Sequence, residues 1–250
     1  MKDKAFMDRG IEVFAKGFAD TRSFAHTCLA KRVGKLWHVK DAPRKKGDYR
    51  REEWIGWGVP AERYRDAAEK HSITRHCVSA ICPIDDPEEE LKAGFKDLGY
   101  RFGMSEAFMV HELKRIPRVE RPVTLKRVKS VDLADRLNTA AKVRQLLPEH
   151  LSSDSPVRQY VALEGDEPVG WVRSHDVGGA TWCSNMFVKP EYRRRGIAKA
   201  MMCQMLRDDR KYGAELAVLT ASKAGAELYP LVGYREIATL LFFTSERGST

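Results

Sequence analysis

The second half of the chain alternates strand-like and helix-like segments in an order that admits few folds. Three runs with strand character follow one another, and a tight-turn sequence, Gly-Asp-Glu-Pro, joins the first two. Apolar residues then recur at helical spacing, and a strand, a helix and a last strand follow. The segments are 158–165, 168–177 and 180–189, a helix that begins near residue 197, and then 214–222, 223–233 and 234–245. This order predicts an α/β domain with a mixed, mainly antiparallel sheet flanked by helices.

Two helical pieces are expected just before these strands, within residues 130–151. Ser130 has the side chain of a helix N-cap, and we place Pro148 near the end of the second piece. Upstream, residues 113–128 contain two prolines and several charges without helical periodicity, which is typical of a linker. The sequence therefore predicts an N-terminal α/β domain at 1–121 and a second domain at 122–250.

The N-terminal half also alternates helices and strands, although its pattern is weaker. A long helix is expected within residues 5–32, and strands at 35–42 and 51–59 are expected around a basic loop. The remaining expected elements are strands at 72–84 and 100–113 and helices at 60–71 and 86–99. The half is thus a second α/β segment of the chain.

One stretch of the N-terminal half repeats a stretch near the end of the chain. Residues 94–101 align with 228–235, so that both copies share Gly-Tyr-Arg, and Phe95 stands where Tyr229 stands without its hydroxyl. An internal duplication explains this match, and so do convergent helix endings, because glycine ends many helices. The N-terminal half is either a degenerate copy that completes the sheet or the substrate cleft, or an unrelated partner-binding module.

The chain is basic, with a net charge of +9 from 44 Lys and Arg against 35 Asp and Glu. This balance suggests an anionic partner without naming it: phosphates of a small cofactor, RNA and an acidic protein surface all qualify. No apolar run approaches the about 20 residues that a membrane-spanning helix needs, and residues 1–20 lack the pattern of a secretory signal. We expect a cytoplasmic protein that does not use a membrane as its partner.

Five cysteines without a Cys-x-x-Cys pair argue against a disulfide framework and against a thiolate zinc site. The nearest approach to a metal cluster is His71, His76 and Cys77 with Cys82 downstream. Their apolar, β-branched surroundings are more typical of a buried strand. We therefore expect no metal.

Residues 187–206 join the third strand to a helix through the sequence Arg-Arg-Arg-Gly-Ile-Ala. The first turn of a helix has backbone N–H groups without intrahelical partners at the positive end of the helix dipole, so it binds phosphate. Gly196 lets a phosphate approach the main chain, and the flanking arginines add charge. Neither a Walker loop nor a Gly-x-Gly-x-x-Gly fingerprint occurs. The similar spacing from Val39 to Gly47 precedes no helix, so we expect a hairpin loop there and a single cofactor site.

This stretch resembles the cofactor motif of the GNAT superfamily of N-acetyltransferases, which is Arg or Gln, two residues, Gly, one residue, then Gly or Ala. Here the motif runs from Arg193 to Ala198, after a strand that ends in the family's aliphatic-x-Val-x-Pro pattern at 186–190. Residues 219–234 are similar to the family's second block, a strand, loop and helix that end in Tyr-x-x-x-Gly-aromatic. The resemblance covers residues 125–245.

The resemblance implies acetyl-CoA as the cofactor, with its pyrophosphate on the amides of 193–198 and its pantetheine paired like an extra strand with 186–188. Arg193 is the motif residue, whereas Arg194 and Arg195 are spacers whose backbone amides matter more than their charges. Ser222 stands where the family often has a cofactor-binding Asn. The expected cofactor-binding residues are Met186, Phe187, Val188, Arg193, Arg194, Arg195, Gly196, Ile197, Ala198 and Ser222.

The resemblance also implies that Tyr229 is the general acid that protonates the departing thiolate of coenzyme A. Many members of the family have a Glu general base on the preceding strand, but this sequence has Ala217 there. The base is therefore elsewhere, a water relay, or unnecessary. The substitutes considered, with none chosen, are His175, Asp176, Glu164, Cys183 and Asn185.

The first hypothesis is an acetyl-CoA-dependent N-acetyltransferase that acts on a primary amine of a small molecule or peptide. In it, a backbone N–H near Val188 holds the oxyanion. The second is a basic nucleic-acid-associated protein that uses the fold as a platform, a partner class that we rank below amines. The third is a CoA-sensing regulator without turnover, suggested by Ala217. The sequence does not identify the acceptor substrate. It also leaves open whether the protein forms a homodimer.

Overall fold

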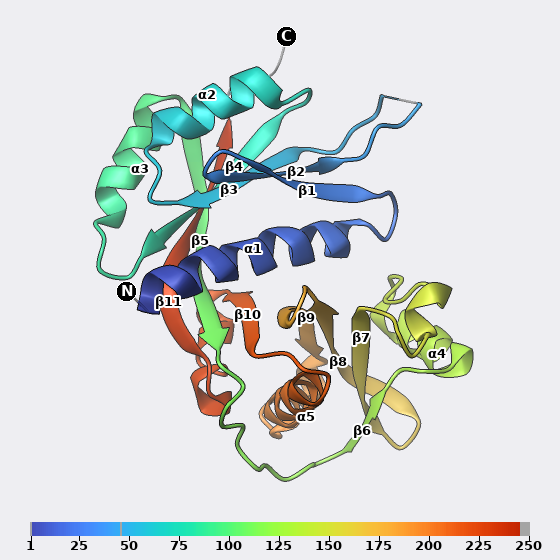
Figure 1. Ribbon diagram of the computed structural model, residues 1–250. Helices are drawn as coiled ribbons and strands as arrows, with labels where there is room; N and C mark the ends of the chain where they lie inside the picture. The colour runs from blue at the N-terminus through green and yellow to red at the C-terminus, as the bar shows by residue number, and fades with distance from the viewer. Residues whose placement is uncertain (1, 46, 246–250) are drawn as a thin grey trace. The chain divides into compact units, whose positions relative to one another are not determined.

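The computed structural model describes residues 2–45 and 47–245, which form two compact units (Figure 1). Within the described residues, unit 1 comprises 2–110, 220–224 and 236–245, and unit 2 comprises 111–219 and 225–235. Each unit is a mixed sheet flanked by helices, which confirms the expected fold class.

The division of the chain into domains at 1–121 and 122–250 remains a prediction. The last five residues of the second domain, 246–250, lie outside the described residues. The compact units differ from it chiefly in the C-terminal strand, β11 (Arg235–Ser245). This strand is antiparallel to β4 (His76–Pro83) from Thr244–Cys77 to Ala238–Pro83. Its packing therefore groups most of it with the N-terminal elements.

In unit 1, a helix precedes an antiparallel meander, a crossover helix and a parallel strand. The remaining elements are α1 (Lys2–Arg22), β1 (Cys28–Val33), β2 (Leu36–Asp41), β3 (Glu52–Trp57), α2 (Ala61–His71), α3 (Glu88–Asp97) and β5 (Tyr100–His111). The strand order is β1-β2-β3-β4-β11-β5, and β3 and β4 are parallel. The hairpin of β2 and β3 confirms the predicted hairpin loop.

The central strand β3 is covered on both faces. On one face, Trp57 Nε1 donates to Asp8 of α1 at 2.9 Å. On the other face, Trp54 packs with Tyr64 of α2 and Phe95 of α3 in the main core cluster of the unit. Residues 52–56 of β3 are therefore all buried, and the two glutamates that begin the strand have hydrogen-bond donors: Ile73 N for Glu52 and Ser79 Oγ for Glu53.

Unit 2 repeats this order of elements. Its elements are β6 (Thr124–Arg127), α4 (Val131–Ala141), η1 (Pro148–Leu151), β7 (Val157–Glu164), β8 (Glu167–Asp176), β9 (Ala180–Val188), η2 (Pro190–Tyr192), α5 (Ile197–Lys211), β10 (Leu216–Ala221), α6 (Lys223–Ala226) and η3 (Pro230–Val232). The strand order is β10-β9-β8-β7-β6, antiparallel except for the parallel pair β9 and β10. One face packs against α4 through Leu137, Val161 and Trp171.

A buried carboxylate fastens α5 to the other face of the unit 2 sheet. Asp209 of α5 is fully buried and accepts from Arg158 Nε and Nη2 at 3.1 and 2.9 Å. It also accepts from Ser174 Oγ at 2.8 Å and from Thr181 Oγ1 at 3.1 Å. One side chain thus ties α5 to β7, β8 and β9.

Most of the elements predicted from sequence are present, and the N-cap of α4 is confirmed, because the Ser130 side chain accepts from Leu133 N. The long helix expected within 5–32 is α1, which begins slightly earlier, at Lys2, and ends at Arg22; the strand β1 in the rest of this stretch was not predicted. The linker prediction missed β6. The placement of Pro148 was wrong, because this proline begins a short 3₁₀ turn. The predicted helix at 223–233 is interrupted before Pro230, which has no N–H to continue it.

We predict that Asp209→Asn lowers the free energy of unfolding by about 3–5 kcal/mol, because it leaves the buried Arg158 guanidinium with only the more distant Asp176 carboxylate, at 3.9 Å, as a counter-charge. Urea unfolding followed by fluorescence measures this. The control is Asp208→Asn, the partly buried neighbour that accepts from Gln204, for which we expect a loss below about 1 kcal/mol. Equal losses in the two variants would refute the anchoring role of Asp209.

Candidate functional site

Strand β9 contains a bulge at the point where the predicted pantetheine-binding residues begin. Trp171 of β8 faces Phe187, but Arg173 faces Ser184, so β9 has one residue more than β8 between these pairs. Asn185 lies in this bulge with φ 56°, a left-handed conformation that Asn tolerates better than most residues. Its side-chain amide donates to Gln145 Oε1. The bulge therefore redirects the second half of β9.

The pairing of β9 with β10 ends near the same place. The parallel rungs are Ala180–Leu216, Thr181–Ala217 and Trp182–Val218. In the described residues of unit 2, the segment from Cys183 to Val188 has no rung with β10. Its backbone groups on that side are available to an extended chain that contains amides. The three predicted residues Met186, Phe187 and Val188 lie on this free edge.

The loop from β9 to α5 has the backbone of an anion site. Arg194 and Gly196 both adopt left-handed conformations, with φ 62° and 78°. Such turns point successive N–H groups toward one concavity. A Cβ on Gly196 would meet no atom within 4 Å, so the space above the glycine is open. The first turn of α5 begins at Ile197, contains no acidic residue and keeps its N–H groups free of intrahelical partners. These residues fit a pyrophosphate.

The three adjacent arginines have different roles in the structure. Arg193 Nε donates to the Val188 carbonyl at 3.0 Å, and its guanidinium lies over the Phe187 ring. Arg195 pairs with Glu164 at 2.9 Å. Arg194 makes no side-chain hydrogen bond or ion pair with any described residue. Arg194, one of the two residues that the motif predicts to be spacers, is thus a cation that is free to meet a ligand.

A pocket of about 480 Å³ lies beside the bulge, between the end of α4 and the β9–α5 loop. Trp171 and Phe187 stack at 4.6 Å between ring centroids and form an aromatic wall. Asn185, Gln145 and the exposed Glu191 supply polar groups, and the pocket is also lined by Lys142 and by Lys189, which pairs with Glu167. This mixture of an aromatic wall and a few polar groups is typical of a small-molecule site.

Tyr229 lies immediately before η3 and is almost fully buried. Its ring meets the Tyr234 ring edge-on at 5.8 Å. Burial raises the pKa of Tyr234 well above its ordinary value, and the neighbouring Cys183 of β9 and Asp209 add to this. Tyr234 therefore lies close to both Tyr229 and the bulged strand. The structure brings the predicted general acid to the β9 side of unit 2.

His111, which the sequence analysis did not single out, fixes the turn after Tyr229. Leu113 N donates to His111 Nδ1 at 2.7 Å, so the ring proton is on Nε2, which donates to the Val232 carbonyl at 3.1 Å. A Cβ at Gly233, whose φ is 103°, would lie only 2.6 Å from His111 Nε2. The turn therefore requires glycine. No sequence pattern marked His111, because this contact joins residues 121 apart.

The substitutes considered for a general base are mostly engaged elsewhere. His175 is fully buried, and burial lowers its pKa well below the ordinary value. Asp176 accepts from Gly178 N in a turn, and Glu164 pairs with Arg195. Burial raises the pKa of the Cys183 thiol. Only Asn185 lines the pocket beside the bulge, and an amide is not a base.

Other sequence expectations concern residues outside this cluster. Ser222 is exposed and lies in the segment 220–224, which belongs to unit 1. All five cysteines are free and buried. Within residues 2–45 and 47–245, no group of three His, Cys, Asp or Glu is arranged to hold a metal. No described helix combines the length and the apolarity needed to cross a bilayer.

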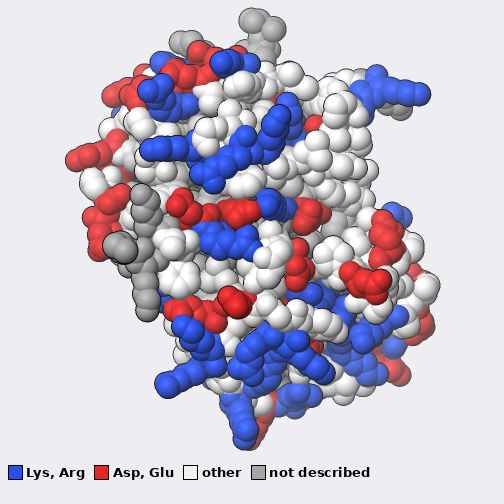
Figure 2. Space-filling model, viewed as in Figure 1, with Lys and Arg blue, Asp and Glu red and all other residues white. Residues whose placement is uncertain are grey.

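Part of the basic excess fastens the linker to α5. Arg207 donates to the Pro117 carbonyl, Arg210 to the Leu113 carbonyl, and Arg121 to Gln204 Oε1. Figure 2 shows Lys and Arg side chains gathered in the lower part of the view, over α5 and the segment that leads to β6. These three guanidinium groups therefore have a structural role, because each forms a hydrogen bond between α5 and the segment 113–121.

Comparison with known proteins supports this geometry. The family described as "Acetyltransferase (GNAT) domain" matches residues 155–236. Among solved structures, a GCN5-related N-acetyltransferase from Kribbella flavida is similar over 97% of this chain and 96% of its own, with 17% identity and a TM-score of 0.65. A functionally unknown conserved protein from Staphylococcus epidermidis covers 90% and 97%, with 16% identity and a TM-score of 0.58. A GCN5-related N-acetyltransferase-like protein from Streptococcus suis covers 95% and 99%, with 13% identity and a TM-score of 0.56. No curated protein matches the chain significantly.

We predict that the thermal stability falls between pH 7.5 and pH 5, and that His111→Gln makes this fall smaller. Burial lowers the pKa of His111, so the stability of its neutral form is complete above about pH 6.5 and is lost as the pH drops through the lowered value. Melting temperatures at both pH values measure the effect. The control is His71→Gln, at an exposed site, which should show the same decrease in melting temperature between the two pH values as the unsubstituted protein. A His111→Gln variant with an unchanged fall would contradict the prediction.

Proposed function

Because the chain belongs to the GNAT superfamily through residues 155–236, we propose that it is an acetyl-CoA-dependent N-acetyltransferase that acts on a primary amine. One observation carries the proposal. The open anion-binding loop at 193–198 directly follows the unpaired edge of β9, so one continuous stretch offers sites for both a diphosphate and an amide-bearing arm. Both halves of coenzyme A require such groups.

Several residues of unit 2 would hold the cofactor, which when bound supplies the acetyl group as a thioester. The N–H groups of the first turn of α5 and of the loop bind the pyrophosphate, and Arg194 adds a charge-assisted contact. The backbone of 186–188 orients the pantetheine. Arg193 contributes indirectly, because its contact with the Val188 carbonyl fixes where β9 ends and the loop begins.

Tyr229 is proposed to donate a proton to the sulfur that leaves. Its carbonyl accepts the N–H groups of Val232 and Tyr234, both at 3.1 Å, so the residue is held at the start of a rigid turn. His111 and Gly233 lock the other side of this turn. A fixed donor loses little conformational freedom in the reaction, which favours proton transfer.

The acceptor amine is proposed to bind in its neutral form in the pocket beside the bulge, where the Trp171 and Phe187 rings suit its apolar part and Glu191 can accept from its N–H groups. Lys142 and Lys189 also line this pocket, which disfavours a cationic ligand. Ala217 is fully buried on β10 and has no proton-accepting group. An amine that arrives neutral, or that loses its proton to water, is therefore the substrate form that this site requires.

The residue at 217 also favours a second candidate, a protein that senses CoA without turnover. Such a protein would bind acetyl-CoA in isothermal titration but release no thiol with any amine class. A nucleic-acid-binding role would instead show RNA or DNA affinity that falls steeply with salt and no response to acetyl-CoA. The linker contacts of Arg121, Arg207 and Arg210 weigh against that role, because they already employ part of the basic surface.

Replacement of Tyr229 by Phe should lower kcat by about 10²-fold to 10⁴-fold and leave acetyl-CoA binding unchanged, since only the proton donor is lost. Thiol release over a panel of amines measures turnover, and isothermal titration measures binding. Tyr234→Phe is the matched control and should stay near the unsubstituted rate, because the Tyr234 hydroxyl has no hydrogen-bond partner to lose. Unchanged turnover in Tyr229→Phe would remove the assigned role.

Gly196→Glu should abolish acetyl-CoA binding, because it places a negative charge in the open space above the loop and strains a left-handed position. Arg194→Ala and Arg194→Gly should both weaken binding by about tenfold, since each loses one charged contact of about 1.5 kcal/mol. Gly213→Glu is the control, with φ 91° and open space just after the other end of α5. A loss of binding in Gly213→Glu equal to that in Gly196→Glu would contradict a phosphate site at the loop.

A further inference from the structure

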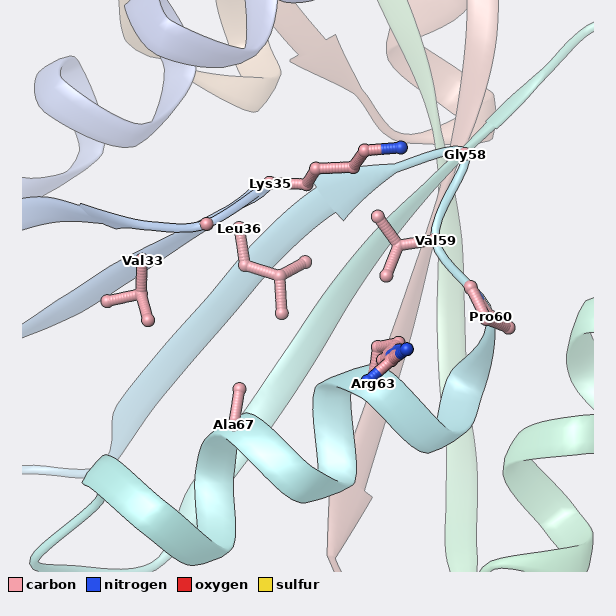
Figure 3. A pocket seen from close by; sticks show the side chains of 9 residues that line it. Val33, Lys35, Leu36, Gly58, Val59, Pro60, Arg63 and Ala67 are labelled. Atoms are coloured by element: carbon pink, nitrogen blue, oxygen red, sulfur yellow. The ribbon is translucent and has the colours of Figure 1, made fainter.

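A separate hollow lies wholly within unit 1, between the tip of the β1–β2 hairpin and the first half of α2 (Figure 3). Its volume is about 380 Å³, and its lining comes from residues 33–36, 58–60, Arg63 and Ala67. Small-ligand sites generally measure about 300–1,000 Å³, so the hollow has the size of a site for a small ligand.

The walls of the hollow are apolar. Leu36 and Val59 belong to the core cluster of the unit, and Val33 and Ala67 pack against that cluster. Figure 3 shows these four side chains directed toward the space between the hairpin and α2. Leu36 and Val59 are already buried, whereas Val33 and Ala67 are partly exposed, so a ligand that covers Val33 and Ala67 removes apolar surface from water. The walls therefore favour an apolar ligand body.

Two cations, and no acidic residue, also line the hollow. They are Lys35 at the hairpin tip and Arg63 on α2. Neither side chain makes an ion pair or hydrogen bond with any described residue, whereas Arg65 on the same helix lies within 4 Å of both Asp66 and Glu69. In Figure 3 the Lys35 amine extends toward Gly58, and Arg63 rises from α2. Two unpaired cations beside an apolar wall are a complement for an anion.

The charges around the hollow differ between its two sides. On the hairpin side, an adjoining hollow shares Lys35 and Gly58 and adds Arg32 and Asp8, and Asp8 accepts from Trp57 Nε1 at 2.9 Å. On the side of α3, another hollow shares residues 58–60 and adds three carboxylates, Glu62, Asp86 and Glu90. The local charge therefore favours a negative ligand group on the hairpin side of residues 58–60, where Lys35 lies.

We propose that this hollow binds a small carboxylate with an apolar body, whose head lies between Lys35 and Arg63 and whose body covers Val33 and Ala67. An arginine fork matches the two oxygens of a carboxylate, and a lysine adds a mobile point charge. The site shares no residue with the proposed cofactor loop at 193–198, so this proposal does not depend on the proposed function.

The experiment uses hexanoate as the probe and the full chain labelled with ¹⁵N, and it follows amide shifts in a titration. The expected result is saturable shifts at residues 33–36 and 58–67. Arg63→Gln and Lys35→Gln should each weaken hexanoate binding at least tenfold. Lys70→Gln, at an exposed site on the last turn of the same helix, should leave it unchanged. Ala67→Phe, which fills the hollow, should abolish it.

Two comparisons separate the parts of the proposal. Hexanol and hexylamine have the same apolar body without the negative head, and both should bind at least tenfold more weakly than hexanoate. Gly196→Glu, which is aimed at the cofactor loop, should leave hexanoate binding intact. Hexyl phosphate distinguishes head groups, and tighter binding of the phosphate than of hexanoate would overturn the carboxylate assignment.

Other results would overturn the site itself. These are the absence of saturable shifts with hexanoate and benzoate, equal binding of hexanol and hexanoate, or an effect of Lys70→Gln as large as that of Lys35→Gln. Thermal unfolding of each variant checks that it is folded. Lys35 and Arg63 are exposed, so their loss should not disturb the core.

Discussion

The buried contact between Asp209 and Arg158 fixes the geometry on which the candidate site depends. A helix held only by apolar packing can slide along a sheet, but a carboxylate that accepts from three strands has one position. The contact acts with Gly170, where a Cβ would lie 3.0 Å from both the Phe187 carbonyl oxygen of β9 and the end of the Met201 side chain of α5, so glycine allows close packing here. Together they set where α5 begins, and therefore where its free N–H groups point.

The site itself arises where regular structure is interrupted. The bulge at Asn185, the end of β9–β10 pairing after Trp182, and the left-handed Arg194 and Gly196 follow one another within a short stretch of chain. Each leaves backbone donors or acceptors without partners in the protein. Unsatisfied backbone groups are costly unless water or a ligand meets them, so their concentration in one place is itself an argument for a ligand.

The sequence predicted the alternation of elements well because most strands and helices have clear periodicity, as Ile197, Met201 and Leu206 show for α5. It missed β1 and β6, which are the outermost strands of the order and are partly exposed, so their apolar pattern is weak. The sequence also could not predict side-chain contacts between residues that are far apart in the chain. The motif distinguished Arg193 from the two spacers Arg194 and Arg195 but did not separate the spacers. Only the fold shows that Arg193 binds the Val188 carbonyl, that Arg195 pairs with Glu164, and that the Arg194 side chain has no polar contact with a described residue.

The two units follow the same order of elements but differ where a diphosphate would bind. In both, an antiparallel meander leads to a parallel pair with a crossover helix, and the Phe95–Tyr100 pair repeats the edge-on contact of Tyr229 and Tyr234. In unit 1, however, only residues 58–60 separate β3 from α2, and Glu62 lies in the first turn of the helix. A loop this short cannot form the concavity made by residues 189–196, and an acidic first turn repels phosphate. Although the two units share a topology, we therefore expect the proposed CoA site in unit 2 alone. The groups that bind an anion belong to the loop before α5, and the corresponding loop of unit 1 lacks them.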